Sequence, residues 1–237
     1  MKLDEILRSL FPDGHDLQVG KGLIAGHGPL AGGGRINVLG VIEGTFLGVD
    51  EALWLGGRVL EIARAPDDTP ILLLVDSGSQ RMSKRDELLG LNEYLAHLAK
   101  ALVLAELNGH SSIGLLYGHS AAGALIATGL ATGALVALAG ATPTVMDLPS
   151  MARVTKLSID YLREKAKTTP IFAPGLDNLA QAGGVLEIWD PGQPLASQLT
   201  SCLSRLTGVD GRDRLGQERG GRPKAAAIAA RIARSTF

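Results

Sequence analysis

The sequence predicts an α/β fold in which parallel strands are joined by helices. Short, wholly apolar runs recur along the chain at 71–75, 113–117 and 134–139, and each is typical of a strand that is buried on both faces of a sheet. Between the first two runs, residues 85–106 repeat leucine at helical spacing. An alternation of buried strands and long helices favours a parallel sheet covered by helices.

The composition indicates a full core built mainly from aliphatic side chains. Of the 237 residues, 46% are hydrophobic but only 4% are aromatic, so leucine, isoleucine, valine and alanine must fill the interior. The 31 glycines are about twice the usual share, which indicates tight turns and close backbone approaches. We expect a single domain over residues 1–237, with a helical C-terminal extension at about 212–237.

Capping and turn residues place the other elements. Asp50 is expected to cap a helix that runs to about Arg64, where Ala65-Pro66 ends it. Residues 76–80 are expected to form a polar turn after the strand at 71–75. The remaining expected elements are strands at 21–25, 35–42 and 145–146, and helices at 1–11, 120–132, 151–167, 195–206 and 223–233.

Charge, apolar patterning and cysteine content indicate the compartment of the protein and the kinds of partner it contacts. The formal net charge is −1, which gives no sign of nucleic-acid binding. The longest apolar region, 113–146, is interrupted by glycines and polar residues, so it reads as core and not as a membrane span. Met1 to Phe11 mixes charges with leucines, unlike a signal peptide. The single cysteine, Cys202, fits a reducing compartment. We expect a cytoplasmic protein that contacts neither nucleic acid nor membrane.

The most informative stretch runs from Leu116 to Leu125. An apolar strand ends on Gly118, and small residues then open a helix, so backbone N–H groups are presented at one point. Such a site can hold an anion or an oxygen that gains negative charge during a reaction. The candidate catalytic residues are Gly118, His119, Ser120 and Ala121, with Gly78 and Ser79 expected to face them from the neighbouring strand end.

Two other interpretations of this stretch stay open. Ser120 could be the nucleophile of a serine hydrolase, because its surroundings miss the G-x-S-x-G pattern by one methyl group. No histidine follows Ser120, however, whereas the general base of that fold does follow its serine. Alternatively, Gly118 and Gly123 only allow a helix to pack closely on a strand. The side chains of His119 and Ser120 could orient a carboxylate or deliver a proton, or Ser120 could simply cap the helix.

Four motifs together resemble a known family. They are VDSGSQ at 75–80, GHSAAGAL at 118–125, VMDLPSMARV at 145–154 and IFAPG at 171–175. Residues 52–149 resemble the carboxyltransferase branch of the crotonase superfamily, and most of the chain resembles the gamma subunits of biotin-independent malonate decarboxylases. The resemblance implies a crotonase-like superhelix of stacked β-β-α units with flanking helices. The family pattern has more glycines in the second loop, where this chain has His119 and Ser120.

The resemblance also implies an activity and partners. A homologous beta subunit would join this chain, and together they would convert a malonyl thioester on an acyl-carrier protein to the acetyl thioester and carbon dioxide. Backbone donors would stabilise the enolate oxygen that forms when carbon dioxide leaves. The substrate would be carried on the CoA-like prosthetic arm of the carrier, and this chain would need no cofactor or metal. A non-catalytic scaffold subunit with the same fold is the other alternative.

Substrate contacts are expected from three further side chains. Gln80 ends the polar segment that faces the glycine turn. Arg153 and Lys156 stand one turn apart in the expected helix at 151–167, where they could meet the phosphate of the carrier's arm. A solvated helix face is the ordinary alternative for such charges. The basic stretch from Arg219 to Arg234 could dock an acidic carrier or pack on the beta subunit, or it could be a solvated tail.

Overall fold

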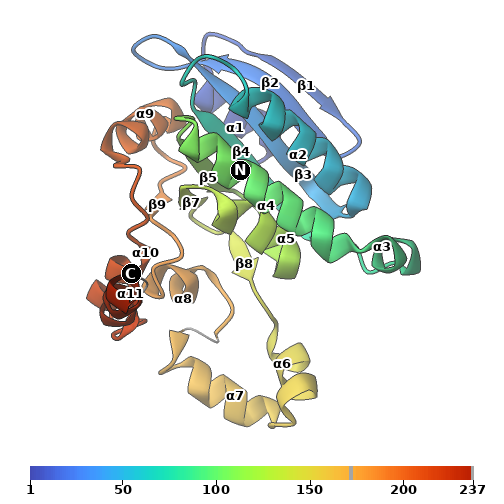
Figure 1. Ribbon diagram of the computed structural model, residues 1–237, viewed down its shortest axis with the longest axis vertical. Helices are drawn as coiled ribbons and strands as arrows, with labels where there is room; N and C mark the ends of the chain where they lie inside the picture. Colours follow the sequence, from blue (N-terminus) through green and yellow to red (C-terminus); the bar gives the residue numbers. More distant parts are fainter. Residues whose placement is uncertain (171–172, 236–237) are drawn as a thin grey trace.

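The computed structural model describes residues 1–170 and 173–235, and within them seven strands form one sheet (Figure 1). In spatial order these are β1 (Asp16–Gly20), β2 (Leu23–Pro29), β3 (Arg35–Leu47), β4 (Ile71–Gln80), β5 (Ser112–Leu116), β7 (Ala134–Leu138) and β9 (Glu187–Trp189). The pairs β1–β2 and β2–β3 are antiparallel, and the later pairs are parallel. The predicted parallel α/β sheet is therefore confirmed from β3 onward.

A second, smaller sheet stands beside the first. It pairs β6 (His119–Ala121) in parallel with β8 (Thr142–Thr144). The helices are α1 (Leu3–Leu10), α2 (Val49–Ala63), α3 (Lys84–Leu89), α4 (Leu91–Leu107), α5 (Ala122–Ala127), the 3₁₀ turn η1 (Gly129–Ala131), α6 (Leu148–Thr155), α7 (Ile159–Ala166), α8 (Leu176–Gln181), α9 (Leu195–Arg205), α10 (Arg212–Glu218) and α11 (Ala225–Ser235). The run β5, β6, α5 is one strand–strand–helix unit.

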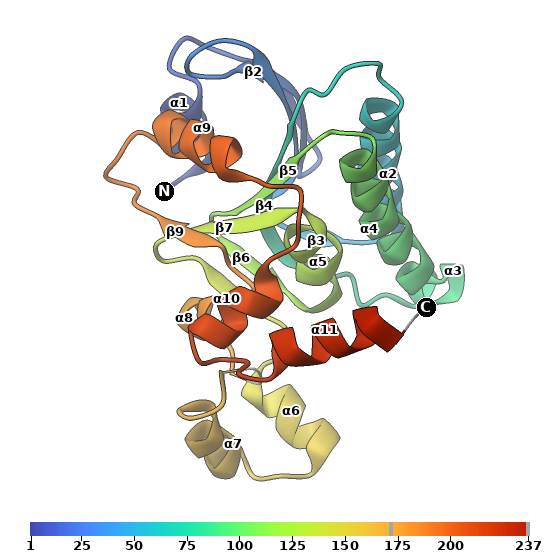
Figure 2. The same cartoon turned by 60° about the vertical axis from the view of Figure 1, so that its left-hand side comes forward.

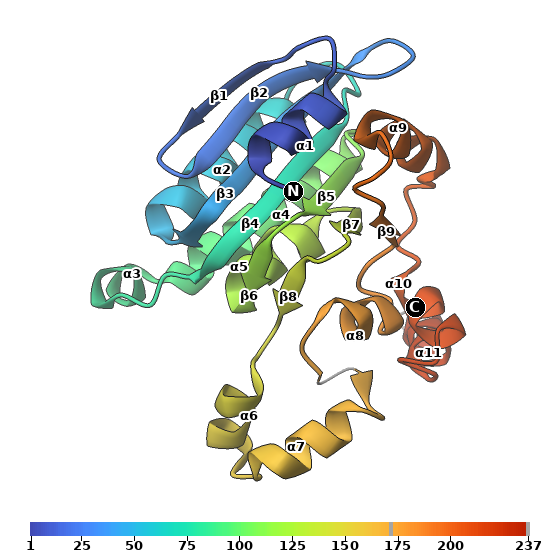
Figure 3. The ribbon, with the colours of Figure 1, turned by 180° about the vertical axis from the view of Figure 1, so that it is seen from behind.

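Both faces of the main sheet are buried. Alternate residues of β4 point to opposite sides: Ile71, Leu73 and Val75 pack in the cluster that includes the apolar faces of α2 and α4, whereas Leu72 and Leu74 pack with α1 and α9. Figure 1 shows α2 and α4 in front of the sheet, and Figure 3, viewed from behind, shows α1 on the opposite face. This alternation confirms that 71–75 is a strand buried on both faces.

Two expected helices are interrupted. Gly90, with φ +77°, ends α3 and precedes α4, so the segment expected at 85–106 is two helices. Lys156 adopts φ +62° and ends α6, so the segment expected at 151–167 is α6 and α7. A residue whose backbone is in the left-handed region cannot continue a right-handed α-helix. The spacing of apolar residues does not report the backbone angles of a single residue, so it predicts neither break.

Several other expectations are wrong in detail. Residues 76–80 continue β4 because Thr45 and Leu47 of the bent strand β3 still pair with them. The helix expected at 120–132 starts only at Ala122, after the β6–β8 pairing, and ends at Ala127. Residues 145–146 are not a strand; the pairing lies at Thr142–Thr144. The strands β1 and β9 and the helix α8 were not expected. Ile171 and Phe172, which open the motif at 171–175, lie outside the described residues.

The start of α2 is not capped by Asp50. Gly48 is the N-cap, and its N–H donates to Glu51 Oε2 at 3.0 Å. The next N–H, of Val49, donates to Asp86 Oδ1 at 2.9 Å. Asp86 thus supplies from α3 the carboxylate that Asp50 was expected to supply locally, while Asp50 forms a surface ion pair with Arg85.

Asp86 should make the fold acid-sensitive. Hydrogen bonds from the Ser83 hydroxyl and the Val49 N–H lower the pKa of this buried carboxyl. A carboxyl with a lowered folded pKa stabilises the fold above its unfolded pKa of about 4, and that contribution is lost as the pH falls through the folded value. We expect Asp86→Asn to lower the free energy of unfolding by about 1–3 kcal/mol at pH 7, and by less at pH 3.

Urea titrations at the two pH values measure this difference, with Asp50→Asn as the control because Asp50 is a surface residue. An Asp86→Asn effect that is equally large at pH 3 would contradict the role of the charged carboxylate.

Candidate functional site

The end of β4 and the segment that follows β5 lie side by side, as the sequence predicted for the two glycine-bearing segments. Asp76 Oδ1 accepts a hydrogen bond from the His119 N–H at 3.0 Å. Further along, the hydroxyls of Ser77 and Ser120 are 2.8 Å apart. Gln80 Oε1 then accepts from the Gly123 N–H at 2.6 Å. Three side chains of one strand therefore reach the predicted anion-binding run.

The two glycines of the run have a steric reason. A Cβ on Gly118 would overlap the carboxylate of Asp76, and a Cβ on Gly123 would overlap the amide oxygen of Gln80. The structure thus supports the alternative in which Gly118 and Gly123 allow close packing. The packed groups are polar side chains of β4 and, at Gly123 in the first turn of α5, also Leu95 of α4.

The backbone of the run differs from the expected helix N-terminus. His119–Ala121 is held as strand β6 by parallel pairing with β8, and the N-cap of α5 is Ala121. Ala122, the first residue of the helix, has φ +50°, a conformation that is costly for a residue with a Cβ. The structure therefore places a sharp, strained bend directly after the predicted site, between β6 and α5.

Two N–H groups of the run from Gly118 to Gly123 already have internal partners. Those of His119 and Gly123 donate to Asp76 and Gln80. A substrate oxygen at these two donors would have to displace a side chain of the same protein. The assignment of Gly118, His119, Ser120 and Ala121 to an anion site stays a prediction, and Asp76 and Gln80 are the groups that any ligand there would meet.

Ser120 does not have the surroundings of a nucleophile. Its side chain is fully buried, and its hydroxyl bonds to Ser77 instead of an imidazole. His119 is exposed, and its Nδ1 lies 3.1 Å from Thr142 Oγ1. Ser120 is also not the helix cap that the alternative interpretation expected. The structure gives this serine a structural partner on β4.

Substitution of Ser120 separates these roles. We expect Ser120→Ala to leave the buried Ser77 hydroxyl without its partner and to lower the free energy of unfolding by about 1–3 kcal/mol. Turnover by the assembled enzyme should persist, since no step needs this hydroxyl. Urea unfolding and a turnover assay measure both effects. The double variant Ser77→Ala/Ser120→Ala should recover part of the stability, and complete loss of turnover in a folded Ser120→Ala protein would contradict this account.

The predicted residues Gly78 and Ser79 occupy the same strand end. A Cβ on Gly78 would lie 2.9 Å from both the carbonyl oxygen of Gly44 and the ring of Phe46, so this glycine faces the bend of β3. Ser79 is half-buried between Gly78 and Gln80. These two residues are therefore close in sequence and in space to the side chains that meet the run at 118–123.

Arg153 and Lys156 are not brought to this site by any contact within the described residues. Arg153 is exposed in the last turn of α6. Lys156 is the left-handed residue that ends α6, and its N–H still bonds to the Ala152 carbonyl oxygen at 2.9 Å, so it follows Arg153 by about one helical turn. Their contact with a phosphate stays a prediction.

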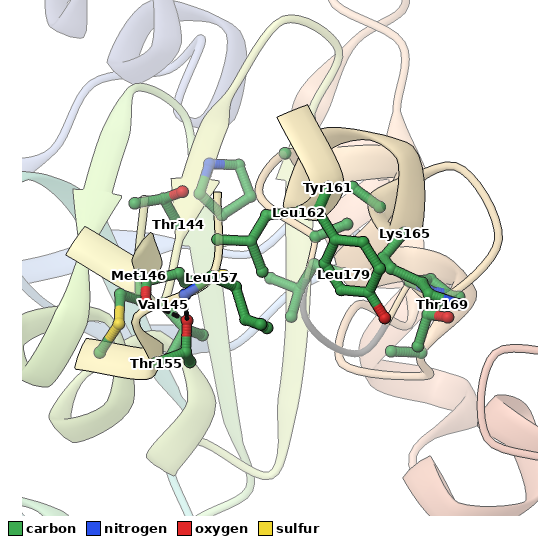
Figure 4. Close-up of a pocket in the computed structure, with 17 residues that line it drawn as sticks. Thr144, Val145, Met146, Thr155, Leu157, Tyr161, Leu162, Lys165, Thr169 and Leu179 are labelled. Carbon is green, nitrogen blue, oxygen red and sulfur yellow. Dashed lines mark hydrogen bonds between the residues drawn. The ribbon is translucent and has the colours of Figure 1, made fainter. Parts of the chain in front are cut away.

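Sequence reasoning missed an apolar cavity beside β8. Its volume is about 590 Å³, and it lies between the end of β8 and helices α6, α7 and α8. Figure 4 shows Thr144 and Met146 on one side of it, Lys165 and Thr169 on the other, and leucine side chains between them. Figures 1 and 2 show α6 and α7 extending away from the main sheet. The apolar side chains of Leu157, Tyr161 and Leu162, around the start of a short helix, were the available signal.

Burial shifts the pKa values of Tyr117 and Cys202. Burial, together with the nearby Asp76 carboxylate, raises the pKa of the Tyr117 hydroxyl far above its usual value, so it stays protonated. Tyr117 immediately precedes Gly118, and its hydroxyl has no hydrogen-bond partner within the described part of the chain. Burial also raises the pKa of the Cys202 thiol to about 12, so this buried thiol does not have the properties of a nucleophile.

Within residues 1–170 and 173–235, no group of three or more histidine, cysteine or carboxylate side chains could hold a metal ion. Across the same residues, none of the helices has the length and hydrophobicity needed to cross a bilayer.

Known proteins identify the family. Residues 43–236 match the family described as malonate decarboxylase gamma subunit, MdcE, and so most of the chain is covered. The chain belongs to the malonate decarboxylase gamma subunit family. It is therefore a subunit of a decarboxylase, and the resemblance stated from its motifs is confirmed.

A curated relative agrees with this assignment. The malonyl-S-ACP:biotin-protein carboxyltransferase MADD of Malonomonas rubra is 29% identical over 202 residues, which span 77% of this chain and 69% of the relative. Its name describes a carboxyltransferase, the wider branch that the motifs resemble. The predicted enzyme class, a component of a decarboxylase, is consistent with both findings.

Solved structures confirm the fold. A chain of a Pseudomonas malonate decarboxylase hetero-tetramer in complex with coenzyme A is 26% identical, with 98% of both chains covered and a TM-score of 0.77. A chain of the Pseudomonas MdcD–MdcE hetero-dimer is also 26% identical, with 98% of this chain and 99% of that chain covered and a TM-score of 0.75. Transcarboxylase 12S, 15% identical over 86% of this chain and 40% of its own, shares the fold, with a TM-score of 0.68. The predicted crotonase-like fold is thereby confirmed.

Proposed function

We propose that this gamma-family subunit and a homologous beta subunit together convert a malonyl thioester on an acyl-carrier protein to the acetyl thioester and carbon dioxide. The family supports the decarboxylase activity. The name of the Malonomonas relative supports a malonyl group on a carrier protein, and the MdcD–MdcE hetero-dimer supports a two-subunit enzyme. The buried, single cysteine is compatible with a cytoplasmic location, which is part of the proposal.

The reaction needs a charge-stabilising site more than a nucleophile. The bond between the carboxylate and the α-carbon breaks, carbon dioxide leaves, and the electron pair moves onto the thioester oxygen as an enolate. A proton then goes to the α-carbon. Each well-placed N–H donor can stabilise such an oxygen by about 3 kcal/mol. This chemistry requires no metal or organic cofactor on the chain; the carrier's prosthetic arm holds the substrate.

One observation carries the assignment of the site to this chain: the end of β4 meets the bend between β6 and α5. On either side of this bend, the His119 and Gly123 N–H groups point at oxygen atoms of Asp76 and Gln80, so the backbone there is already arranged to bind oxygen atoms. We infer that part of the thioester site forms at this bend, from Gly118 to Ala121, with Gly78 and Ser79 beside it. His119, exposed next to the bend, is the candidate group to orient the carboxylate or deliver the proton.

Decarboxylation by purified subunits tests the proposal. Malonyl thioester of the carrier is supplied to the chain alone, to the beta subunit alone and to the reconstituted pair, and carbon dioxide release is measured. We expect turnover only from the pair. Full activity from this chain without its partner would overturn the shared site, and a pair that assembles but decarboxylates no malonyl thioester would overturn the reaction itself.

A further inference from the structure

The apolar cavity between β8 and the α6–α7 pair has the size and lining of a ligand site. Its volume of about 590 Å³ falls in the ordinary range for pockets that hold small molecules. Leu157, Leu162 and Leu179 supply the middle of its wall. Hydroxyls are placed at its two sides, from Thr144 and Thr169 (Figure 4), and neither hydroxyl forms a hydrogen bond within the described part of the chain. A long, partly polar ligand could therefore bind across it.

One end of the cavity adjoins the predicted reaction site. Pro143 and Thr144 of β8 line the cavity, and the same two residues pair with Ser120 and Ala121 of β6. A ligand that enters between α6 and α7 therefore reaches the strand next to the proposed oxyanion run. The hydrogen bond from the Thr142 N–H to the Gly118 carbonyl holds the two strands together at this point.

The other end of the cavity carries a free positive charge. On and just after α7, Arg163 pairs with Asp160 at 2.5 Å and Lys167 pairs with Glu164 at 2.7 Å. Within residues 1–170 and 173–235, Lys165 has no carboxylate at ion-pair distance; its ammonium lies 5.6 Å from the centre of the Tyr161 ring. Lys165 lies on the side of the cavity opposite Thr144 (Figure 4). An anion bound at this end would pair with the Lys165 ammonium.

We propose that this cavity receives the prosthetic arm of the acyl-carrier protein, with the phosphate of the arm at Lys165 and its thioester end directed along β8 toward β6. A phosphopantetheine-like arm has the required chemistry: a phosphate at one end, amides and methyl groups along its length, and the thioester at the other. The inference rests on the proposed function, and it replaces Arg153 and Lys156 with Lys165 as the phosphate contact.

The test compares two substrates that differ only in the phosphate. The reconstituted gamma–beta pair is assayed with malonyl-4′-phosphopantetheine and with malonyl-pantetheine. We expect the unmodified pair to prefer the phosphorylated substrate by about fivefold in kcat/KM, the size of one exposed ion pair. Lys165→Met should abolish this preference. Lys167→Met is the matched control, since Lys167 is already paired with Glu164 and should leave the preference unchanged.

A second variant tests the cavity itself. Leu162→Trp places a larger side chain in the middle of the wall and should raise KM for both arm-bearing substrates by about tenfold, with malonyl-N-acetylcysteamine, which lacks most of the arm, unaffected. An unchanged phosphate preference in Lys165→Met would overturn the proposal. A Leu162→Trp chain that folds but no longer binds the beta subunit would also overturn it, because the cavity would then be a subunit contact. Loss of all thioester turnover in the unmodified pair would instead refute the proposed function.

Discussion

The substitution Gly118→Ala should lower decarboxylation by the assembled enzyme by at least about 100-fold. A Cβ at this position would overlap the carboxylate of Asp76. Either Asp76 or the backbone must move, and the hydrogen bond between Asp76 and the His119 N–H is lost with the movement. The donors that we assign to the enolate oxygen would then be displaced, and a site of this kind tolerates very little displacement.

The measurement is kcat/KM for a malonyl thioester, with size-exclusion chromatography to show that the two subunits still associate. Gly57→Ala is the matched control. Gly57 lies within α2, and a Cβ there would meet nothing within 4 Å, so the same change should leave turnover intact and slightly stabilise the helix. If the Gly118→Ala pair assembles and turns over like the parent, the chain is a scaffold and the reaction takes place elsewhere.

Replacement of Arg219 should produce the largest loss of stability among the C-terminal cations. Its guanidinium donates to the carbonyl oxygens of Ala180, Val185 and Leu186 at 2.6 to 2.7 Å. These carbonyls lie at the end of α8 and just before β9. Arg219→Met would leave all three without a charged donor, and we expect the free energy of unfolding to fall by about 3 kcal/mol.

Urea unfolding of the full chain, followed by circular dichroism, measures this loss. Arg231→Met is the control, because Arg231 is exposed on α11 and its removal should change the stability by less than about 0.5 kcal/mol. Equal effects of the two substitutions would show that the C-terminal arginines act only through overall charge. A loss confined to Arg219 would show that α10 is part of the folded body.

The C-terminal cations illustrate what residue types alone could not decide. From the sequence, the stretch from Arg219 to Arg234 could dock a partner or remain solvated. The structure divides it: Arg219 and Arg222 bind backbone carbonyls near α8, whereas Arg231 and Arg234 stay exposed on α11. An arginine that satisfies distant carbonyls has the same local sequence as one in water, so no local pattern separates the two.

The predicted site shows the same division. Glycine after a buried strand pointed to the run at 118–123, and the polar residues after the other buried strand pointed to a second segment, and the two segments do lie side by side. The roles of Asp76 and Gln80, and the partnership of Ser77 with Ser120, depend on pairing across 43 residues of chain. A carboxylate directly after a buried strand was visible in the sequence, but its target was not.

The sequence by itself determined the α/β class, the strands buried on both faces and the family, because alternation of apolar runs and short motifs are local properties of the chain. Tertiary structure decided that residues 76–80 extend β4, that 119–121 form a strand with β8, and that α6 and α7 separate at Lys156. It also decided that Lys165 faces the cavity and Arg153 does not line it. Each of these depends on which distant segment supplies a hydrogen-bond partner or an apolar wall, and that choice is made only when the whole chain packs.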